Sequence, residues 1–284
     1  MRCLVSLLVI LASTSAPMAV LGAQDVHALR AQYTIKAPAE SRALILRGAA
    51  GAASSTPVAF GASWRDAFVG GGFQHSTRAV ARAGEPVPPN GPNDGSIALA
   101  VGLGDANSLG MEGVLTALST VRRGLGKRSA LSLKAHRRLG RNDGIALGVE
   151  HGVVLGSQPT DGTRSWYAVV SHVTSLRSAQ QSGHPESPLA LSLSAGIGNG
   201  RFRRVVDIRH NREAVNVFGA AAVAFRSRFS VLAEYTGQDV TVGMSVVPFH
   251  RWPVVLTPTL ADLSGAASRS PRLLLGVGLV LQSR

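Results

Sequence analysis

The chain has 284 residues, of which 45% are hydrophobic and 16% charged, and its formal net charge is +13. This length allows one large all-β domain or two ordinary domains. A basic excess is typical of proteins with anionic partners. However, the basic residues are scattered through predicted turns, only 5% of residues are aromatic, and no RNP, KH or zinc-finger spacing is present. We therefore expect no nucleic-acid partner.

The N-terminal segment has the features of a secretory signal peptide. Met1-Arg2 precedes an apolar run from Leu4 to Leu11, and small residues continue to Ala23. This run is about half of the ~20 residues that a membrane-spanning helix needs, so residues 1–23 are predicted to be a signal peptide. The single cysteine, Cys3, lies within it, so the remaining chain has no thiol for a disulfide, a metal site or a nucleophile.

Residues 24–57 are predicted to form a periplasmic arm or linker that is partly disordered, because they end in the low-complexity run GAAGAASSTP. From residue 58 the character of the sequence changes, and residues 58–284 are assigned to a second, β-rich domain. A long loop is expected at 85–95, where four prolines occur with Asn-Gly and Asp-Gly steps.

The β-rich part has a repeating period of two, which is the pattern of extended strands. It is clearest in the stretch from Val215 to Leu263, where Thr236-Gly237-Gln238 separates two alternating runs as in a hairpin. About 12 strands are predicted, each of roughly 9–11 residues, which is the length of the alternating segments in transmembrane β-barrels. Their ranges are Ala67–Gln74, Ser96–Gly104, Gly113–Arg122, Ser129–Arg138, Gly144–Val154, Ser165–Ser175, Pro188–Gly198, Val215–Phe225, Arg228–Thr236, Asp239–Val247, Val254–Asp262 and Arg272–Leu281.

Strand length and the composition of the two faces favour a transmembrane barrel. One face is apolar, as in Leu189, Leu191 and Leu193, and the other is small, polar or charged. Strands of roughly 9–11 residues suit a tilted crossing of a bilayer, whereas soluble strands centre near five or six. The predicted fold is therefore an all-β, closed, antiparallel transmembrane β-barrel of about 12 strands. A secreted β-sandwich shows similar alternation and remains the alternative.

Several segments resemble a group of uncharacterised bacterial proteins that look like outer-membrane β-barrels. They include AFGASWRDAFVGGGFQ, AVGLGDAN, LSTVRRGLGKRSALSLKAHRRL, GNGRFR, VNVFGA, AEYTGQDVTVGMSVVPF and TPTLADLSG. The resemblance extends from about residue 59 to the C-terminus. It implies the barrel fold and a place in the bacterial outer membrane, and it carries over no catalytic residue.

Charged residues on the polar face are candidates for the lining of a lumen. They are Lys134, His136, Arg138, Glu150, Arg228, Glu234 and Asp239. In a water-filled pore, a basic excess would favour small anionic solutes. The same groups can instead pair across a narrow barrel and fill it, because the bore grows only with the number of strands. The sequence leaves both interpretations open.

A second charged group lies in a predicted outer loop at 199–214. It consists of Arg201, Arg203, Arg204, Arg209 and Arg212. Guanidinium groups bind phosphate through paired hydrogen bonds, so a lipopolysaccharide or other outer-membrane lipid is a candidate partner. The alternative is a solvated loop without a ligand.

An enzyme is not expected. His136, His151 and His172 occur near serines, but no GxSxG elbow and no spaced acid partner accompany them. The glycine-rich segments at 101–105 and 198–200 precede no helical pattern, so they are not phosphate loops. No HExxH or EF-hand pattern is present, and we expect no metal and no cofactor.

The leading functional hypothesis is a passive, weakly anion-selective pore in the outer membrane. The first alternative is a structural or adhesive barrel with an occluded lumen, and the second is an outer-membrane lipid-modifying enzyme. If the fold is a sandwich, the location is periplasmic or extracellular. The sequence does not identify the oligomeric state.

Overall fold

The computed structural model describes residues 50–78, 83–86, 89–123, 127–156, 164–177, 189–225, 228–249, 252 and 254–282. The predicted signal peptide at 1–23 and residues 24–49 of the predicted arm lie outside this part of the chain.

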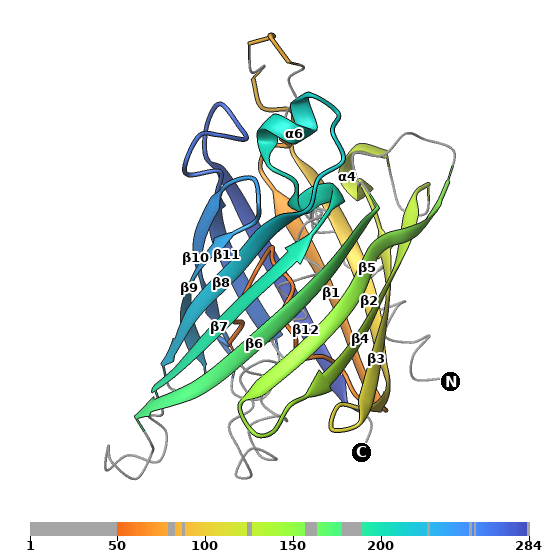
Figure 1. Ribbon diagram of the computed structural model, residues 1–284, viewed down its shortest axis with the longest axis vertical. Helices are drawn as coiled ribbons and strands as arrows, with labels where there is room; N and C mark the ends of the chain where they lie inside the picture. The colour runs from red at the N-terminus through yellow and green to blue at the C-terminus, as the bar shows by residue number, and fades with distance from the viewer. Residues whose placement is uncertain are drawn as a thin grey trace.

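In the described residues, twelve antiparallel strands close into a barrel in which each strand pairs with its sequence neighbours and β1 pairs with β12 (Figure 1). The predicted closed antiparallel barrel is confirmed. The strands are β1 Asp66–Gln74, β2 Asp94–Asp105, β3 Leu109–Ala117, β4 Ser129–Arg138, β5 Asp143–Leu155, β6 Ser165–Arg177, β7 Leu189–Gly198, β8 Asn216–Phe225, β9 Phe229–Tyr235, β10 Val240–Val246, β11 Val254–Ala261 and β12 Arg272–Gln282.

The apolar face of the strands points away from the barrel axis. In β2, Leu99, Val101 and Leu103 are each 46% exposed, whereas the alternate residues Ala98 and Ala100 are buried. A soluble sandwich would bury its large apolar residues and expose the polar ones. The observed arrangement is the reverse and is that of a barrel whose outer surface contacts lipid. Among the described residues, no helix is long and apolar enough to cross a membrane.

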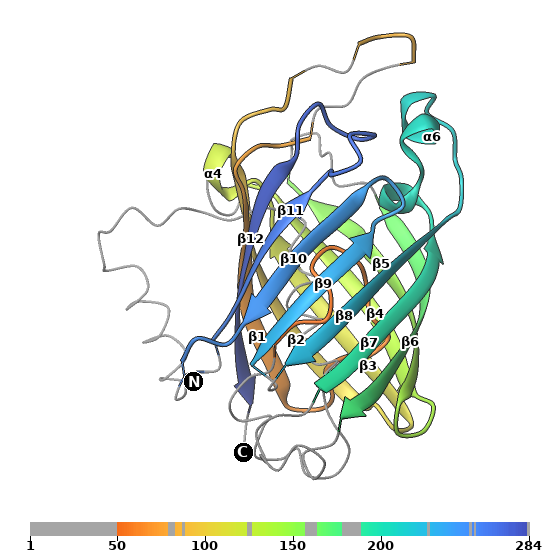
Figure 2. The ribbon, with the colours of Figure 1, turned by 90° about the vertical axis from the view of Figure 1, so that its left-hand side faces the viewer.

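The two ends of the barrel differ. The first residue of β1, Asp66, pairs with Gln282 of β12, so the chain enters and leaves the barrel at the same end, here called the terminal end. The opposite end, here called the loop end, carries the long connection from β1 to β2 and the short helices: α4 Thr120–Arg123, the 3-10 helix η1 Gly200–Phe202, and α6 Val205–Arg209 (Figure 2). This division places the connections that contain the predicted loops at 85–95 and 199–214 on the same side of the barrel.

Part of the lumen is filled by an aromatic cluster from the wall. Phe202 stacks on Phe218 with 4.4 Å between ring centroids, and Tyr167 meets both rings edge to face. The cluster needs a residue without a side chain beside it, because a Cβ at Gly148 would lie 2.3 Å from the Tyr167 ring. The small residues of the inner face thus make room for rings within a narrow barrel.

Two strands depart from their sequence patterns. The strand predicted at Gly113–Arg122 is wrong in its bounds, because β3 starts at Leu109 and ends at Ala117. Ser119 then adopts a φ of 51° and α4 follows, which ends the strand. The β10–β11 ladder also has a gap between the pairs Gly243–Thr259 and Val246–Leu256, where Pro258 has no N–H to donate.

The outer surface predicts a strong, depth-dependent effect of charge. Leu133 lies midway along β4 and is 52% exposed, so Leu133→Arg should destabilise the barrel in lipid vesicles by roughly 2–4 kcal/mol. The matched variant is Leu139→Arg, which changes a residue of similar exposure (53%) in the turn after β4 and should cost roughly 0–1 kcal/mol. Denaturant unfolding of vesicle-embedded protein measures both. Equal effects would contradict a lipid-facing wall.

Candidate functional site

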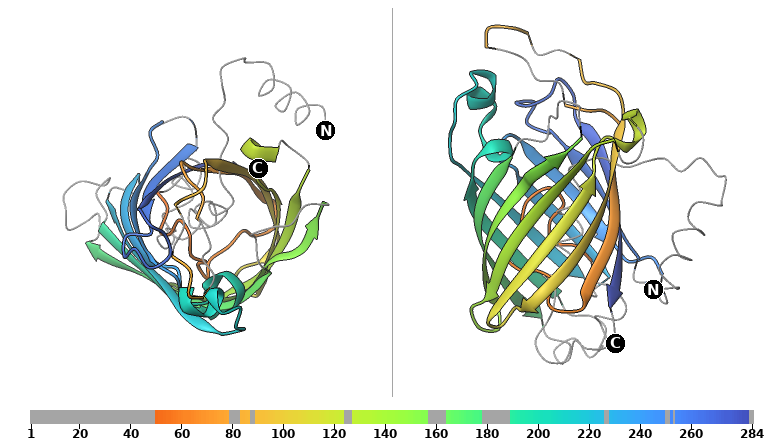
Figure 3. Two further views of the ribbon diagram at one scale, coloured as in Figure 1. Left: turned by 90° about the horizontal axis from the view of Figure 1, so that it is seen from above. Right: turned by 90° about the vertical axis from the view of Figure 1, so that its right-hand side faces the viewer.

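The lumen contains residues 50–63 of the same chain, here called the plug segment. Views along the barrel axis and from the side show it inside the ring of strands (Figure 2; Figure 3). Residues 50–60 and Ala62 are buried, and the segment contains no strand or helix. It must therefore satisfy its peptide groups with side chains of the wall.

The first half of the plug segment rises from the terminal end. There, the N–H of Gly51 donates to Ser245 Oγ at 2.8 Å, and its carbonyl accepts from Ser230. These two serines are paired on β9 and β10 close to the turn that joins β10 to β11. The segment then climbs along the wall, with Ser54 near Thr259 of β11.

Glu234 on β9 holds the top of the plug segment. Its carboxylate accepts hydrogen bonds from the backbone N–H groups of three consecutive residues, Ser54, Ser55 (2.8 Å) and Thr56 (2.7 Å), and from the Thr56 hydroxyl (3.0 Å). Successive N–H groups that converge on one anion form a backbone nest. Glu234 is 3% exposed, so these bonds replace the water that its carboxylate loses on burial.

The second half of the plug segment descends along β6, β4 and β3. The N–H of Ala59 donates to Ser171 at 2.9 Å. Lower down, Lys134 donates to the carbonyl of Phe60, and the imidazole Nε2 of His136 lies 2.9 Å from the carbonyl oxygen of Ala62.

Glu112 completes this lower contact. It accepts from the N–H of Ala62 at 3.1 Å, and its carboxylate lies 4.0 Å from Lys134 Nζ. A side chain at Gly61 would strike the His136 ring, since a Cβ there would lie 2.6 Å from it. The wall and the plug segment therefore fit closely at this level.

An ion pair joins the plug segment to the loop end. Arg201 lies 2.6 Å from Glu150, donates to the carbonyl of Ser55, and lies 4.5 Å above the Phe202 ring. The top of the plug segment thus contacts a carboxylate through its N–H groups and a guanidinium through one carbonyl.

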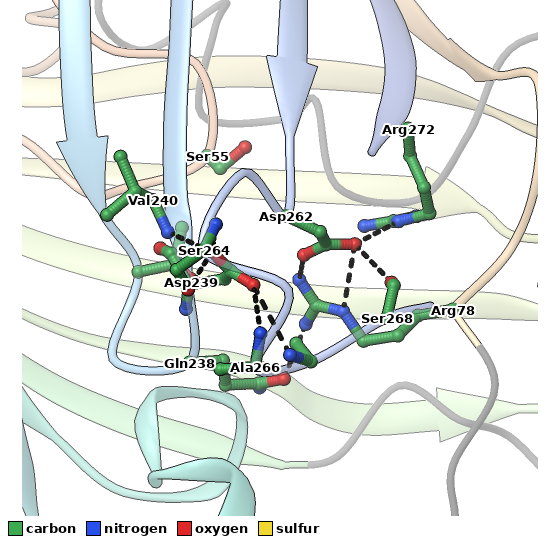
Figure 4. A network of polar contacts seen from close by, with 12 residues as sticks. Ser55, Arg78, Gln238, Asp239, Val240, Asp262, Ser264, Ala266, Ser268 and Arg272 are labelled. Atoms are coloured by element: carbon green, nitrogen blue, oxygen red, sulfur yellow. Dashed lines mark hydrogen bonds and ion pairs between the residues drawn. The ribbon is translucent and has the colours of Figure 1, made fainter. Parts of the chain in front are cut away.

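Two buried carboxylates order the connections at the loop end (Figure 4). Asp239 accepts from the N–H groups of Ser264 (2.7 Å), Ala266 (3.1 Å) and Ala267 (3.2 Å) in the β11–β12 loop. Asp262, in the same loop, binds the guanidinium groups of Arg78 and Arg272.

The position of Asp262 changes its acidity. Burial by itself raises the pKa of this carboxyl, but the positive charges of Arg78 and Arg272 and the hydroxyl of Ser268 outweigh burial and lower the pKa to about 2. Gln238 extends the same network, since it accepts from Arg78 and donates to the carbonyl of Arg201. Four connections at the loop end, β1–β2, β7–β8, β9–β10 and β11–β12, are therefore joined above the plug segment.

The predicted lumen residues separate into two groups. Lys134, His136, Glu150 and Glu234 point into the barrel and contact the plug segment or its ion pair. The others do not line the filled lumen. Arg138 is at the terminal mouth, Arg228 donates to the carbonyl of Val247 at the terminal end, and Asp239 is buried in the loop network.

The five arginines of the predicted outer loop also have internal contacts. Arg204 and Arg212 each lie 3.1 Å from Asp207, and Arg203 bonds the carbonyls of Gly200 and Arg212. Arg209 lies 3.5 Å from the carbonyl oxygen of Ala266, and Arg201 pairs with Glu150. These contacts hold the loop to itself, to β5 and to the β11–β12 loop, and they occupy donors that could otherwise bind an external phosphate.

Sequence reasoning missed the plug segment, because it assigned residues up to 57 to a linker outside the barrel. The structure places 50–57 inside it. One signal was available: residues 48–64 are small or apolar and carry no charge in an otherwise basic chain. Such a composition suits a narrow lumen. Within the described ranges, no group of three or more His, Cys, Asp or Glu residues is arranged to hold a metal.

The sequence matches no protein-family model and no curated protein. The similar solved structures include a porin and an outer membrane channel. A KdgM porin is 12% identical, with a TM-score of 0.42, over 76% of this chain and 99% of that one. The COG4313 outer membrane channel from Pseudomonas putida F1 is also 12% identical, with a TM-score of 0.44, over 76% and 95%.

The plug segment predicts a protected interior. In a Cys3→Ser background, Ala53→Cys should react with a polar maleimide at least about 100-fold more slowly than Ser108→Cys, because Ala53 is fully buried and Ser108 lies in an exposed turn. Ala53→Cys changes little volume, so the barrel should fold normally. Equal labelling rates in folded protein would show that the plug segment does not occupy the lumen.

The Asp262 network predicts an acid-sensitive loop. Because the folded pKa of about 2 lies below the ordinary value of 3.8, the stabilisation is complete above pH 3.8 and is lost as the pH falls toward 2. Hydrogen exchange of residues 262–271 should accelerate across this window. Asp262→Asn should remove that acid-dependent step, whereas Asp143→Asn, an exposed site on β5, should retain it.

Proposed function

We propose that this protein is an outer-membrane channel for small solutes whose lumen is closed at rest by residues 50–63. The contact between Glu234 and the backbone nest of the plug segment carries the proposal. It closes the lumen with a few directional bonds and no strand pairing, so it can break while the barrel stays intact.

The barrel surface supports the location. Closed barrels with an apolar outer band are suited to lipid, because closure satisfies every backbone group of the wall. Such barrels have short turns at the periplasmic side and longer loops outside. By this rule the terminal end faces the periplasm, and the Asp239 and Asp262 network faces the cell exterior.

The weakness of the individual plug contacts supports movement. A neutral hydrogen bond contributes about 0.5–1.5 kcal/mol net and one to a charged group roughly 1.5–3 kcal/mol. The plug segment is rich in Ala, Gly and Ser, so it buries less apolar area than a segment of large side chains. Water that enters the lumen can also replace the polar contacts of the plug segment. It cannot replace the backbone hydrogen bonds between the strands of the wall.

The charges of the lumen bear on selectivity. Where the wall meets the plug segment, the carboxylates of Glu112, Glu150 and Glu234 face the cations of Lys134 and Arg201. The basic excess of the chain is therefore not concentrated there. A weak preference for anions, if the channel opens, would arise at the terminal mouth, where Arg138 and Arg141 lie.

A permanently occluded structural barrel is the second candidate. The aromatic cluster of Tyr167, Phe202 and Phe218 favours it, because these rings fill the lumen beside the plug segment. We propose no enzymatic activity. His136 contacts a carbonyl of the plug segment and His172 contacts Asp143 on the barrel surface, so neither is placed as the base of a serine nucleophile.

Planar-bilayer recording tests the channel. Wild-type protein should show rare openings, and Glu234→Gln should raise the open probability at least about tenfold. Gln retains one acceptor oxygen but turns an NH₂ group toward the N–H donors of the plug segment, so the closed state loses hydrogen bonds. A loss of about 1.4 kcal/mol changes the ratio of closed to open channels by a factor of ten. Glu213→Gln is the matched control, since it removes the same charge from an exposed loop position.

A plugged channel, a passive open pore and a structural barrel give different recordings. A plugged channel responds to Glu234→Gln and not to Glu213→Gln. A steady wild-type current that neither substitution changes would indicate a passive open pore and contradict closure at rest. Silence of all three proteins, after heat-modifiable gel mobility has confirmed folding, would support the structural barrel.

A further inference from the structure

A cavity of about 190 Å³ lies at the terminal mouth, between the plug segment and the wall. The plug contributes Phe60, Gly61 and Ser63, and the wall contributes two turns and an inward-facing histidine. The lining residues on the wall are Asp105, Ala106, Asn107, His136, Arg138, Arg141 and Val173. Because a water molecule occupies about 30 Å³ in the liquid, the space accommodates a small ion with a few waters.

Two residues that line this cavity, His136 and Arg138, each carry a buried polar atom without a partner among the described residues. His136 is 2% exposed, and its Nδ1 has no hydrogen-bond partner among the described residues. The Nε of Arg138 is likewise buried without a partner among the described residues, and Nη2 of the same guanidinium makes a long hydrogen bond of 3.4 Å to the carbonyl of Arg141. Buried polar atoms normally have partners, so each such atom points to a missing one.

The local charge is positive. Arg138 and Arg141 bring two guanidinium groups, and neither has a carboxylate within ion-pair distance among the described residues. Asp105 is the one acid that lines the cavity, and its carboxylate already accepts from the N–H and side-chain amide of Asn107, each at 2.9 Å. Two cations beside one engaged carboxylate favour an anion.

The tautomer of His136 narrows the chemistry of that anion. Its Nε2 lies 2.9 Å from the carbonyl oxygen of Ala62, and a carbonyl accepts only, so Nε2 carries the proton. In the neutral ring, Nδ1 is then an acceptor. The ligand that fits offers negative oxygens to the arginines and one hydroxyl to Nδ1.

We propose that this cavity binds free hydrogen phosphate. The P–OH group donates to His136 Nδ1, and the charged oxygens bind Arg138 and Arg141. The site uses the closed state of the plug segment, since Phe60–Ser63 form one wall. It does not require that the barrel conducts.

Titration calorimetry of full-length protein folded in a phosphate-free detergent tests the proposal. Inorganic phosphate should bind saturably at a 1:1 ratio and at least about tenfold more tightly than sulfate, which has the same shape but no hydroxyl at neutral pH. Arg138→Ala/Arg141→Ala should weaken phosphate binding at least about tenfold. Arg137→Ala, which removes an exposed charge next to Arg138 in sequence, should leave it unchanged.

Each outcome decides the point. Absence of saturable phosphate binding by wild-type protein would overturn the site. An equal loss in Arg137→Ala would reduce it to general surface charge, and equal affinity for sulfate would overturn the role of His136. Glycerol phosphate is largely dianionic at neutral pH and then has no P–OH group, so it should bind no more tightly than sulfate, and tighter binding would overturn the role of the P–OH group. Binding is measured on the closed barrel, so this result is independent of the conductance experiments.

Discussion

The peptide groups of the plug segment determine how the interior of this protein is built. A chain inside a barrel has no neighbouring strand to pair with, and a buried peptide group without a partner is costly. The wall therefore supplies side chains at the heights where the segment needs them. Glu234 binds three N–H groups in a row, while Lys134 and His136 face carbonyls. The inward charges that suggested a pore thus serve first as partners for another part of the chain.

Packing imposes a second constraint on the same surface. The lumen of a twelve-stranded barrel is too narrow to hold a chain segment with large side chains all around it. Most residues of the inner face are therefore small, and only a few are aromatic. Alanines and serines line the path of the plug segment, and Tyr167, Phe202 and Phe218 fill the rest. The ion pairs of Arg201 with Glu150 and of Lys134 with Glu112 keep the charges inside nearly balanced, which limits the cost of burying them.

The sequence predicted the wall well and its contents poorly, for a physical reason. Period-two alternation is a local property, so β4 was predicted with its observed bounds, and the inward direction of Lys134 and Glu234 followed from it. β3 was displaced because Gly110 and Gly113 blur the alternation at its start. The plug segment has no period at all, and its partners lie up to 205 residues away, as with Ser54 and Thr259. Contacts of that kind depend on closure of the ring, which no local pattern encodes.

The route of the plug segment through the lumen has a topological consequence. Gly51 contacts serines near one mouth of the barrel, and Trp64 bonds the carbonyl of Gly104 at that same mouth. The segment therefore enters the lumen and leaves it at the same end, as a loop, and it is not threaded from one end of the barrel to the other. It can be inserted or withdrawn without passing a chain end through the ring and without breaking the β1–β12 seam. Ring closure and plug insertion are thus separable steps, free to occur in either order during assembly.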